Sequence, residues 1–93
     1  MFTDQIRPGS VVYATAGKEQ GGFYMVTQVC AGFVLIADGK HRPLERPKRK
    51  NLRHIRLTQT VWEPEGMSNK ALRARLREYS APGTAVTGGN RFV

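Results

Sequence analysis

The sequence is poor in cysteine and in long apolar runs, and each shortage excludes a class of protein. Its only cysteine, Cys30, has no second thiol with which to form a disulfide within the chain, which favours a reducing compartment. No apolar run approaches the roughly 18 residues that a membrane span needs. The opening residues MFTDQIRPGS also lack the apolar core of a secretion signal. We therefore expect a cytoplasmic protein with no membrane partner.

Motifs for nucleotide binding, metal binding and catalysis are scarce as well. The segment GKEQGG lacks the GK[ST] ending of a phosphate-binding P-loop. Two histidines and one cysteine are too few ligands for a convincing metal site. Cys30, His41 and Asp38 can be written as a catalytic trio, but a cysteine within VCAG is more typical of a small packed hydrophobic residue. We expect no enzyme, no cofactor and no metal.

Acidic residues are few, and positive charge is abundant. The 93 residues hold 15 Lys and Arg against seven Asp and Glu, which gives a formal net charge of +8 at pH 7. Eight of these cations, both histidines and only two acids lie in residues 37–57, the basic stretch. Because apolar runs flank the basic stretch, the fold should fix where its charge points. Such a density of Arg and Lys suits a polyphosphate ligand, although charge runs are often merely solvated.

Short runs of β-forming residues, separated by turn residues, predict a mainly β fold. The expected strands are residues 11–14, 23–29, 33–37, 40–44 and 54–57. Gly17, Gly21 and Gly22 can turn the chain after the first strand. Asp38-Gly39 predicts a hairpin that starts a returning strand at Lys40, and Pro43 favours an edge position there. Five short strands in about 50 residues predict a small closed or half-open barrel.

The chain after this β region predicts one helix of about three turns. Residues 62–66 break the β pattern, and Ser68 can cap a helix whose apolar stripe is Leu72, Leu76 and Tyr79. Several cations flank the stripe, namely Lys70, Arg73, Arg75 and Arg77. We therefore divide the chain into a barrel with a basic loop (1–60), a linker and helix (61–80) and a tail without periodicity (81–93), which we expect to be disordered.

Several motifs of the β region resemble one known family. The run GSVVYATAGKEQGGFYMVTQV resembles the KOW motif, and ADGK, RPLERPKRKN and HIRLT resemble its continuation in KOW-domain ribosomal proteins and their small bacterial relatives. The resemblance covers roughly residues 8–58. It implies an SH3-like barrel of about five strands, with RNA in ribosomes as the usual partner and proteins as partners in transcription elongation factors. The predicted helix lies outside the KOW core.

The charge and the resemblance together predict a noncatalytic RNA-binding module, associated with ribosomes or ribosomal RNA. Two prolines, Pro43 and Pro47, should make RPLERPKRKN a semi-rigid strip that loses little entropy on binding. The candidate RNA-binding residues are Lys18, Lys40, His41, Arg42, Arg46, Lys48, Arg49, Lys50, Arg53 and His54. Candidates for base stacking are Tyr13, Tyr24, His41 and His54, although tyrosines in so small a barrel are more often core.

Two other functions stay open at this point. The helix stripe or a barrel edge could dock a protein of the translation or transcription machinery, while the charge only steers association. The charge also permits DNA binding, which is disfavoured because no helix-turn-helix or zinc motif is present.

Overall fold

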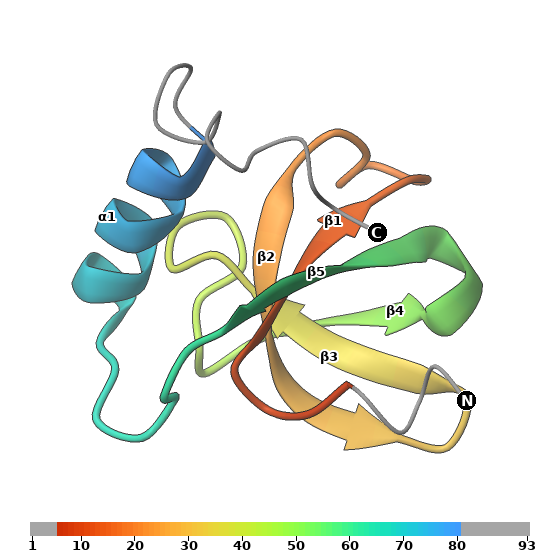
Figure 1. Ribbon diagram of the computed structural model, residues 1–93, viewed down its shortest axis with the longest axis horizontal. Coiled ribbons are helices and arrows are strands. Elements are labelled where there is room, and N and C mark those ends of the chain that lie inside the picture. The colour runs from red at the N-terminus through yellow and green to blue at the C-terminus, as the bar shows by residue number, and fades with distance from the viewer. Residues whose placement is uncertain (1–5, 81–93) are drawn as a thin grey trace.

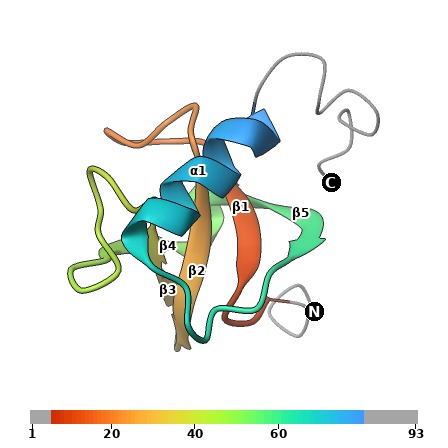
Figure 2. The same cartoon turned by 90° about the vertical axis from the view of Figure 1, so that its left-hand side faces the viewer.

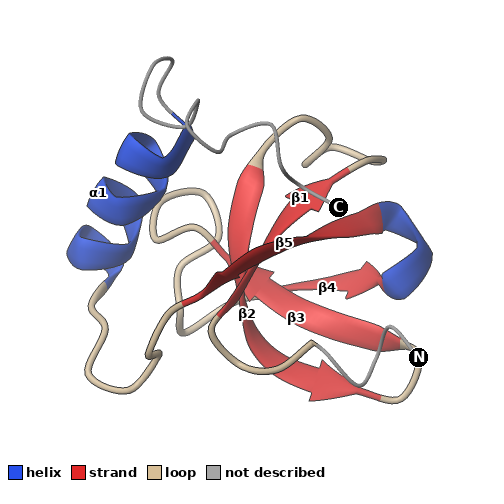
Figure 3. Cartoon of the chain, viewed as in Figure 1, coloured by secondary structure: helices blue, strands red, loops and turns tan. Residues whose placement is uncertain are grey.

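Five antiparallel strands form one sheet in the computed structural model, which describes residues 6–80 (Figure 1). The strands are β1 (Ser10–Ala14), β2 (Phe23–Cys30), β3 (Phe33–Ala37), β4 (Lys48–Asn51) and β5 (Ile55–Val61). Their order in the sheet is β4-β3-β2-β1-β5, so the last strand returns to pair with the first. One helix, α1 (Asn69–Ser80), follows the sheet (Figure 3). The predicted mainly β fold with one helix after it is confirmed, while the predicted tail 81–93 lies outside the described residues.

One face of the sheet encloses an inner core of small branched residues. Alternate residues of β1, β2 and β3 point to this face, because side chains along a strand alternate between its two sides. Ile55 and Leu57 of β5 pack on the same cluster as Val34 and Ile36 of β3. Since β3 and β5 are not neighbours in the sheet, their contact requires the sheet to curl around the cluster. The sheet stays open because β4 and β5 do not pair within the described residues. A small barrel-like fold is compatible with this arrangement.

Helix α1 covers part of the outer face of the sheet (Figure 2). Leu72 and Leu76 are buried against Val11, Met25 and Ala37. Burial of a leucine side chain contributes roughly 1.5–3 kcal/mol, which is how a short helix with four cations is held in place. The Oγ atom of Ser68 accepts a hydrogen bond from the N–H of Ala71 (3.1 Å). The predicted cap and the buried leucines of the predicted stripe are therefore confirmed.

The fourth strand starts later than the sequence predicted. We expected a strand over residues 40–44, but residues 38–47 form a loop and β4 begins at Lys48. The Asp38 carboxylate accepts hydrogen bonds from the N–H groups of Lys40 and Arg42 (2.9 and 2.8 Å), which folds the chain back on itself. Gly39, with φ +81°, allows this compact turn. The two prolines have no N–H to donate to a strand partner, so the ladder starts only after the second one.

The last strand also differs from its predicted bounds of 54–57. A single 3-10 turn, η2 (Leu52–His54), comes first, and β5 runs from Ile55 to Val61. The side chain of Asn51 accepts a hydrogen bond from the N–H of Arg53 (2.9 Å) and so starts the turn. Thr58 then binds the carbonyl of Val11 through its hydroxyl (2.7 Å), which keeps a polar residue buried beside β1.

Candidate nucleic-acid interface

Strand β4 sends its cations to opposite faces of the sheet. In the register with β3, Lys50 lies opposite Val34, and Arg49 lies opposite Leu35. Val34 belongs to the inner core, and paired residues of antiparallel strands share a face. Lys50 therefore points to the inside of the curled sheet and Arg49 to the outside.

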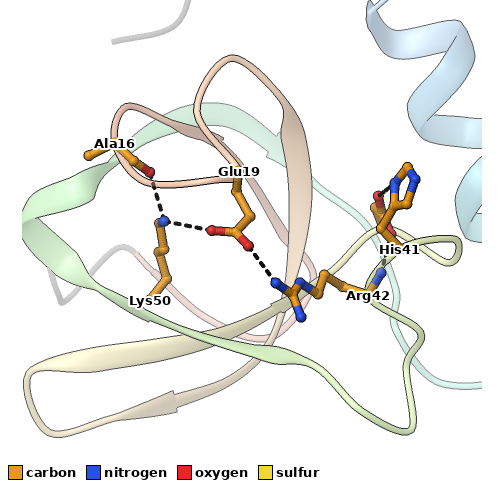
Figure 4. Close-up of polar contacts among 6 residues, drawn as sticks. Ala16, Glu19, His41, Arg42 and Lys50 are labelled. Carbon is orange, nitrogen blue, oxygen red and sulfur yellow. Dashed lines mark hydrogen bonds and ion pairs between the residues drawn. The ribbon is translucent and has the colours of Figure 1, made fainter.

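The ammonium group of Lys50 is held in a buried polar cluster (Figure 4). Its Nζ atom donates to the carbonyl of Ala16 (2.7 Å) and to Oε1 of Glu19 (2.9 Å). The other carboxylate oxygen of Glu19 accepts from Nη2 of Arg42 (2.8 Å). The side chains of Lys50 and Glu19 are only 7% and 4% exposed, whereas that of Arg42 is 33% exposed. A Cβ atom at Gly17 would lie 2.7 Å from the Lys50 ammonium, so the close approach depends on glycine.

The cluster of Glu19, Lys50 and Arg42 joins three parts of the chain. Glu19 comes from the β1–β2 loop, Lys50 from β4 and Arg42 from the β3–β4 loop. The hydrogen bond from Lys50 is the main reason that the pKa of Glu19 falls from 4.5 to about 2; burial opposes the fall, and the bond from Arg42 adds to it. The ammonium group of Lys50 is buried and bonded to Glu19 and Ala16 rather than presented at the surface. We therefore remove it from the candidate RNA-binding residues as a structural cation.

The segments that this cluster joins, together with η2, carry most of the exposed Lys and Arg of the basic stretch. Beyond the link between Arg42 and Glu19, the N–H of Thr15 donates to the carbonyl of His54 (2.9 Å), so the β1–β2 loop also contacts η2. The exposed candidates on these segments and on β4 are Lys18, Lys40, His41, Arg46, Arg49, Arg53 and His54, and Lys48 is half-buried. Among the described residues, none of the Lys and Arg in this set forms an ion pair with an acid, while His41 lies 3.8 Å from Asp38.

An open depression of about 500 Å³ lies beside β4, on the side of Arg49. Its lining residues are Ala31, Gly32, Phe33, Lys48, Arg49 and Asn51. The guanidinium carbon of Arg49 lies 4.0 Å from the centre of the Phe33 ring, which is the geometry of a cation–π contact. Sequence reasoning missed Phe33 because FVLIA resembles a fully buried strand. Only its register with β4 shows that alternate residues face outward.

The tyrosines that we considered for base stacking are used in packing. Tyr24 belongs to the inner core, where burial is the main cause that raises the pKa of its hydroxyl. Tyr13 packs on Phe23 with their ring centres 5.2 Å apart. Phe23 in turn contacts Tyr79 of α1 (5.1 Å). A packing role in the core therefore fits Tyr24 better than a role in base stacking does.

Helix α1 braces the β3–β4 loop. Asn69, at the start of the helix, accepts a hydrogen bond from the N–H of Leu44 (2.7 Å) and donates to the carboxylate of Glu45 (2.7 Å). A Cβ atom at Gly39 would clash with the carbonyl oxygen of Asn69, so the loop and the helix touch there. Because its leucines face the sheet, the helix offers no free leucine stripe to a protein partner.

The described residues show neither a metal site nor a membrane-spanning helix, and the comparisons with known proteins found no relative. Within residues 6–80, no three His, Cys, Asp or Glu side chains gather as metal ligands would. None of the helices described is both long and apolar enough to cross a membrane. A scan against protein-family models and a search of curated proteins both gave no match. The likeness to KOW proteins therefore depends on the sequence motifs alone.

Proposed function

We propose that this chain is a noncatalytic, cytoplasmic RNA-binding module with an SH3-like barrel of the KOW type. The observation that carries the proposal is the group of exposed cations on three contacting segments, which have no acidic partner among the described residues. Cations without a partner repel one another, and a polyphosphate relieves that repulsion while releasing its counterions. Association with ribosomal RNA is the part of the proposal that comes from the KOW resemblance.

The buried cluster supports this function indirectly. By fixing the β1–β2 and β3–β4 loops on β4, Glu19 holds Lys18, Arg46 and Arg49 on segments with a defined geometry. Preorganised cations lose less conformational entropy on binding than cations on a flexible tail. The predicted role of the prolines is thus supplemented by tertiary contacts.

Salt dependence of RNA binding tests the proposal. For a single-stranded RNA, the logarithm of the affinity should fall with the logarithm of the salt concentration, with a slope near −0.7 for each phosphate contact. The triple variant K18A/R46A/R53A should lower the magnitude of that slope by about 2, because it removes three contacts. Its matched control is K70A/R75A/R77A, which removes the same charge from exposed positions on α1. Salt-independent binding, or an equal loss in both variants, would contradict the proposed surface.

Two further arms separate the other functions. Equal affinity for duplex DNA and for structured RNA would favour a general nucleic-acid binder. Sedimentation of tagged protein through a density gradient, at low and high salt and with or without nuclease, tests the ribosomal part. We expect nuclease-sensitive comigration with ribosomal particles that high salt weakens. Comigration with a protein complex that nuclease does not affect would favour a protein-interaction module instead.

A further inference from the structure

Helix α1 leaves one end of the outer sheet face uncovered. Ala37, at the last position of β3, packs against the helix in the outer core, together with its β2 partner Met25. Phe33 and Leu35 point to the same face, because they are four and two positions before Ala37. They are only half-buried, and the β2–β3 hairpin that carries Phe33 lies on the side of the molecule away from α1 (Figure 1).

The uncovered end combines a planar apolar surface with positive charge and an amide. The guanidinium of Arg49 lies over the Phe33 ring, and Lys48 lines the same depression. Asn51 lies at the end of β4, where its Oδ1 atom accepts a hydrogen bond from the N–H of Arg53. Its Nδ2 atom donates no hydrogen bond to another described residue. At Gly32, in the hairpin turn, a Cβ atom would meet nothing within 4 Å, so the turn leaves the depression open.

We propose that this depression binds one unpaired nucleotide of an RNA strand, with its base stacked on the pair formed by Arg49 and Phe33. Lys48 would contact the adjoining phosphate, and the Nδ2 group of Asn51 would donate to an acceptor on the base edge. This inference rests on the proposed RNA-binding function and adds to it the chemical class that the site takes. Unpaired bases in RNA commonly stack on aromatic rings and on guanidinium planes.

The composition of the depression favours a nucleotide over simpler ligands. An inorganic phosphate would use Lys48 and Arg49 but would gain nothing from the Phe33 ring. An apolar peptide would have to bury two cations without a counter-charge, which is costly. A nucleotide has a π-face for the stacked pair, a negative charge for Lys48 and acceptors for an amide, so it satisfies all the groups that line the depression.

The experiment compares an intact RNA with one that lacks bases. A fluorescein-labelled, single-stranded oligoribonucleotide and its abasic counterpart are titrated by anisotropy against the full chain. The variants are F33L, which keeps an apolar side chain but removes the ring, and R49K, which keeps the charge but removes the plane. Their matched controls are F33Y, which retains a ring, and R77K, which makes the same exchange at an exposed arginine of α1, outside the depression and the proposed phosphate-binding surface.

We expect F33L and R49K each to weaken binding of the intact RNA by about 5- to 150-fold, the range that base–aromatic stacking supports. F33Y and R77K should bind like the parent chain, and the abasic strand should bind all five proteins alike. Because F33L removes no charge, its salt slope should stay unchanged. Thermal unfolding followed by circular dichroism checks that the variants fold. In a parallel titration, the ring protons of Phe33 should shift in NMR spectra with the intact RNA only.

Failure of this inference is distinct from failure of the proposed function. Salt-dependent RNA binding that is the same in F33L, or the same for intact and abasic strands, would overturn the nucleotide site and leave the phosphate-binding surface standing. If the parent chain showed no salt-dependent RNA binding, both would be overturned. If R49K weakened RNA binding and F33L did not, the stacking site would also be overturned, because Arg49 would then contribute through phosphate binding alone.

Discussion

Arg49 and Lys50 are neighbours in the chain and carry the same charge, yet the fold uses them in opposite ways. Arg49 faces outward, where its guanidinium lies over Phe33 beside an open depression. Lys50 faces inward, where its ammonium is enclosed by Ala16 and Glu19. The difference arises from the alternation of a β-strand, which sends consecutive side chains to opposite faces. A run of basic residues on an edge strand is therefore two sets of cations, one structural and one available to a ligand.

Several substitutions can separate the structural cations from the cations available to a ligand. Among them, replacement of Glu19 should have the largest effect on stability. In E19Q the ammonium of Lys50 stays buried without a counter-charge, so we expect a loss of about 3–5 kcal/mol in the free energy of unfolding. Urea denaturation at pH 7 measures this loss. The control is E45Q, in which the carboxylate that is lost is exposed and hydrogen-bonded to Asn69. A loss below about 1 kcal/mol in E19Q would mean that the inward cluster is not structural.

Acid should weaken the same cluster. The pKa of Glu19 is about 2 in the folded protein against 4.5 ordinarily, so its contribution is complete above the ordinary value and is lost as the pH falls through the folded one. At about 1.4 kcal/mol per pKa unit, the difference amounts to about 3 kcal/mol. Urea denaturation is measured at pH 7, 4.5 and 2.5, which cover this pH range. The free energies of unfolding of the parent chain and of E19Q should converge as the pH falls. A constant difference between the two would show that the Glu19 charge is not responsible.

Replacement of Lys50 should cost less than replacement of its partner. In K50M, Glu19 keeps its bond from Arg42 and a methionine fills the space of the lysine stem, so we expect a loss of about 1–3 kcal/mol. The matched control is K48M, the same exchange two positions earlier on β4, for which a change within about 0.5 kcal/mol is expected. Thermal unfolding of the two variants side by side gives the comparison. Equal losses would mean that the buried ion pair with Glu19 does not set Lys50 apart from Lys48, which the register places on the same face of β4.

Replacement of Arg49 should have the smallest effect on stability. The R49A variant loses one exposed cation–π contact, which is worth about 0.5–1 kcal/mol. Chemical denaturation measures this change, and K50M is the comparison. We expect RNA affinity to fall in R49A while the fold is kept. An R49A variant as unstable as K50M would assign Arg49 a structural role as well.

Much of the fold follows from local sequence patterns. The Phe33–Ala37 strand was predicted with its observed bounds, and the helix followed from Ser68 and two leucines one turn apart. These elements depend on residues close together in the chain, which is why the pattern was sufficient. The β3–β4 connection was mispredicted because Asp38-Gly39 is a common hairpin signal. Here the Asp38 carboxylate bonds to the N–H groups of Lys40 and Arg42, which forms a longer loop.

The candidate site was predictable only in part. The excess of cations in the basic stretch was visible in the sequence, and so was the lack of metal-binding and catalytic motifs. The exclusion of Lys50 was not visible, because its partner Glu19 lies 31 positions earlier in the chain. The role of Phe33 was hidden for a related reason: a continuous apolar strand gives no sign of which residues the helix leaves uncovered.

The sequence by itself determined the strand-rich β region, the capped amphipathic helix and the positive charge, since these depend on composition and on the spacing of nearby residues. The tertiary structure decided how that charge is divided. Strand register placed Arg49 beside Phe33, and the return of the β1–β2 loop placed Glu19 against Lys50. The physical reason is that burial and ion pairing are properties of distances in space, which the curling of the sheet sets between residues far apart in the chain.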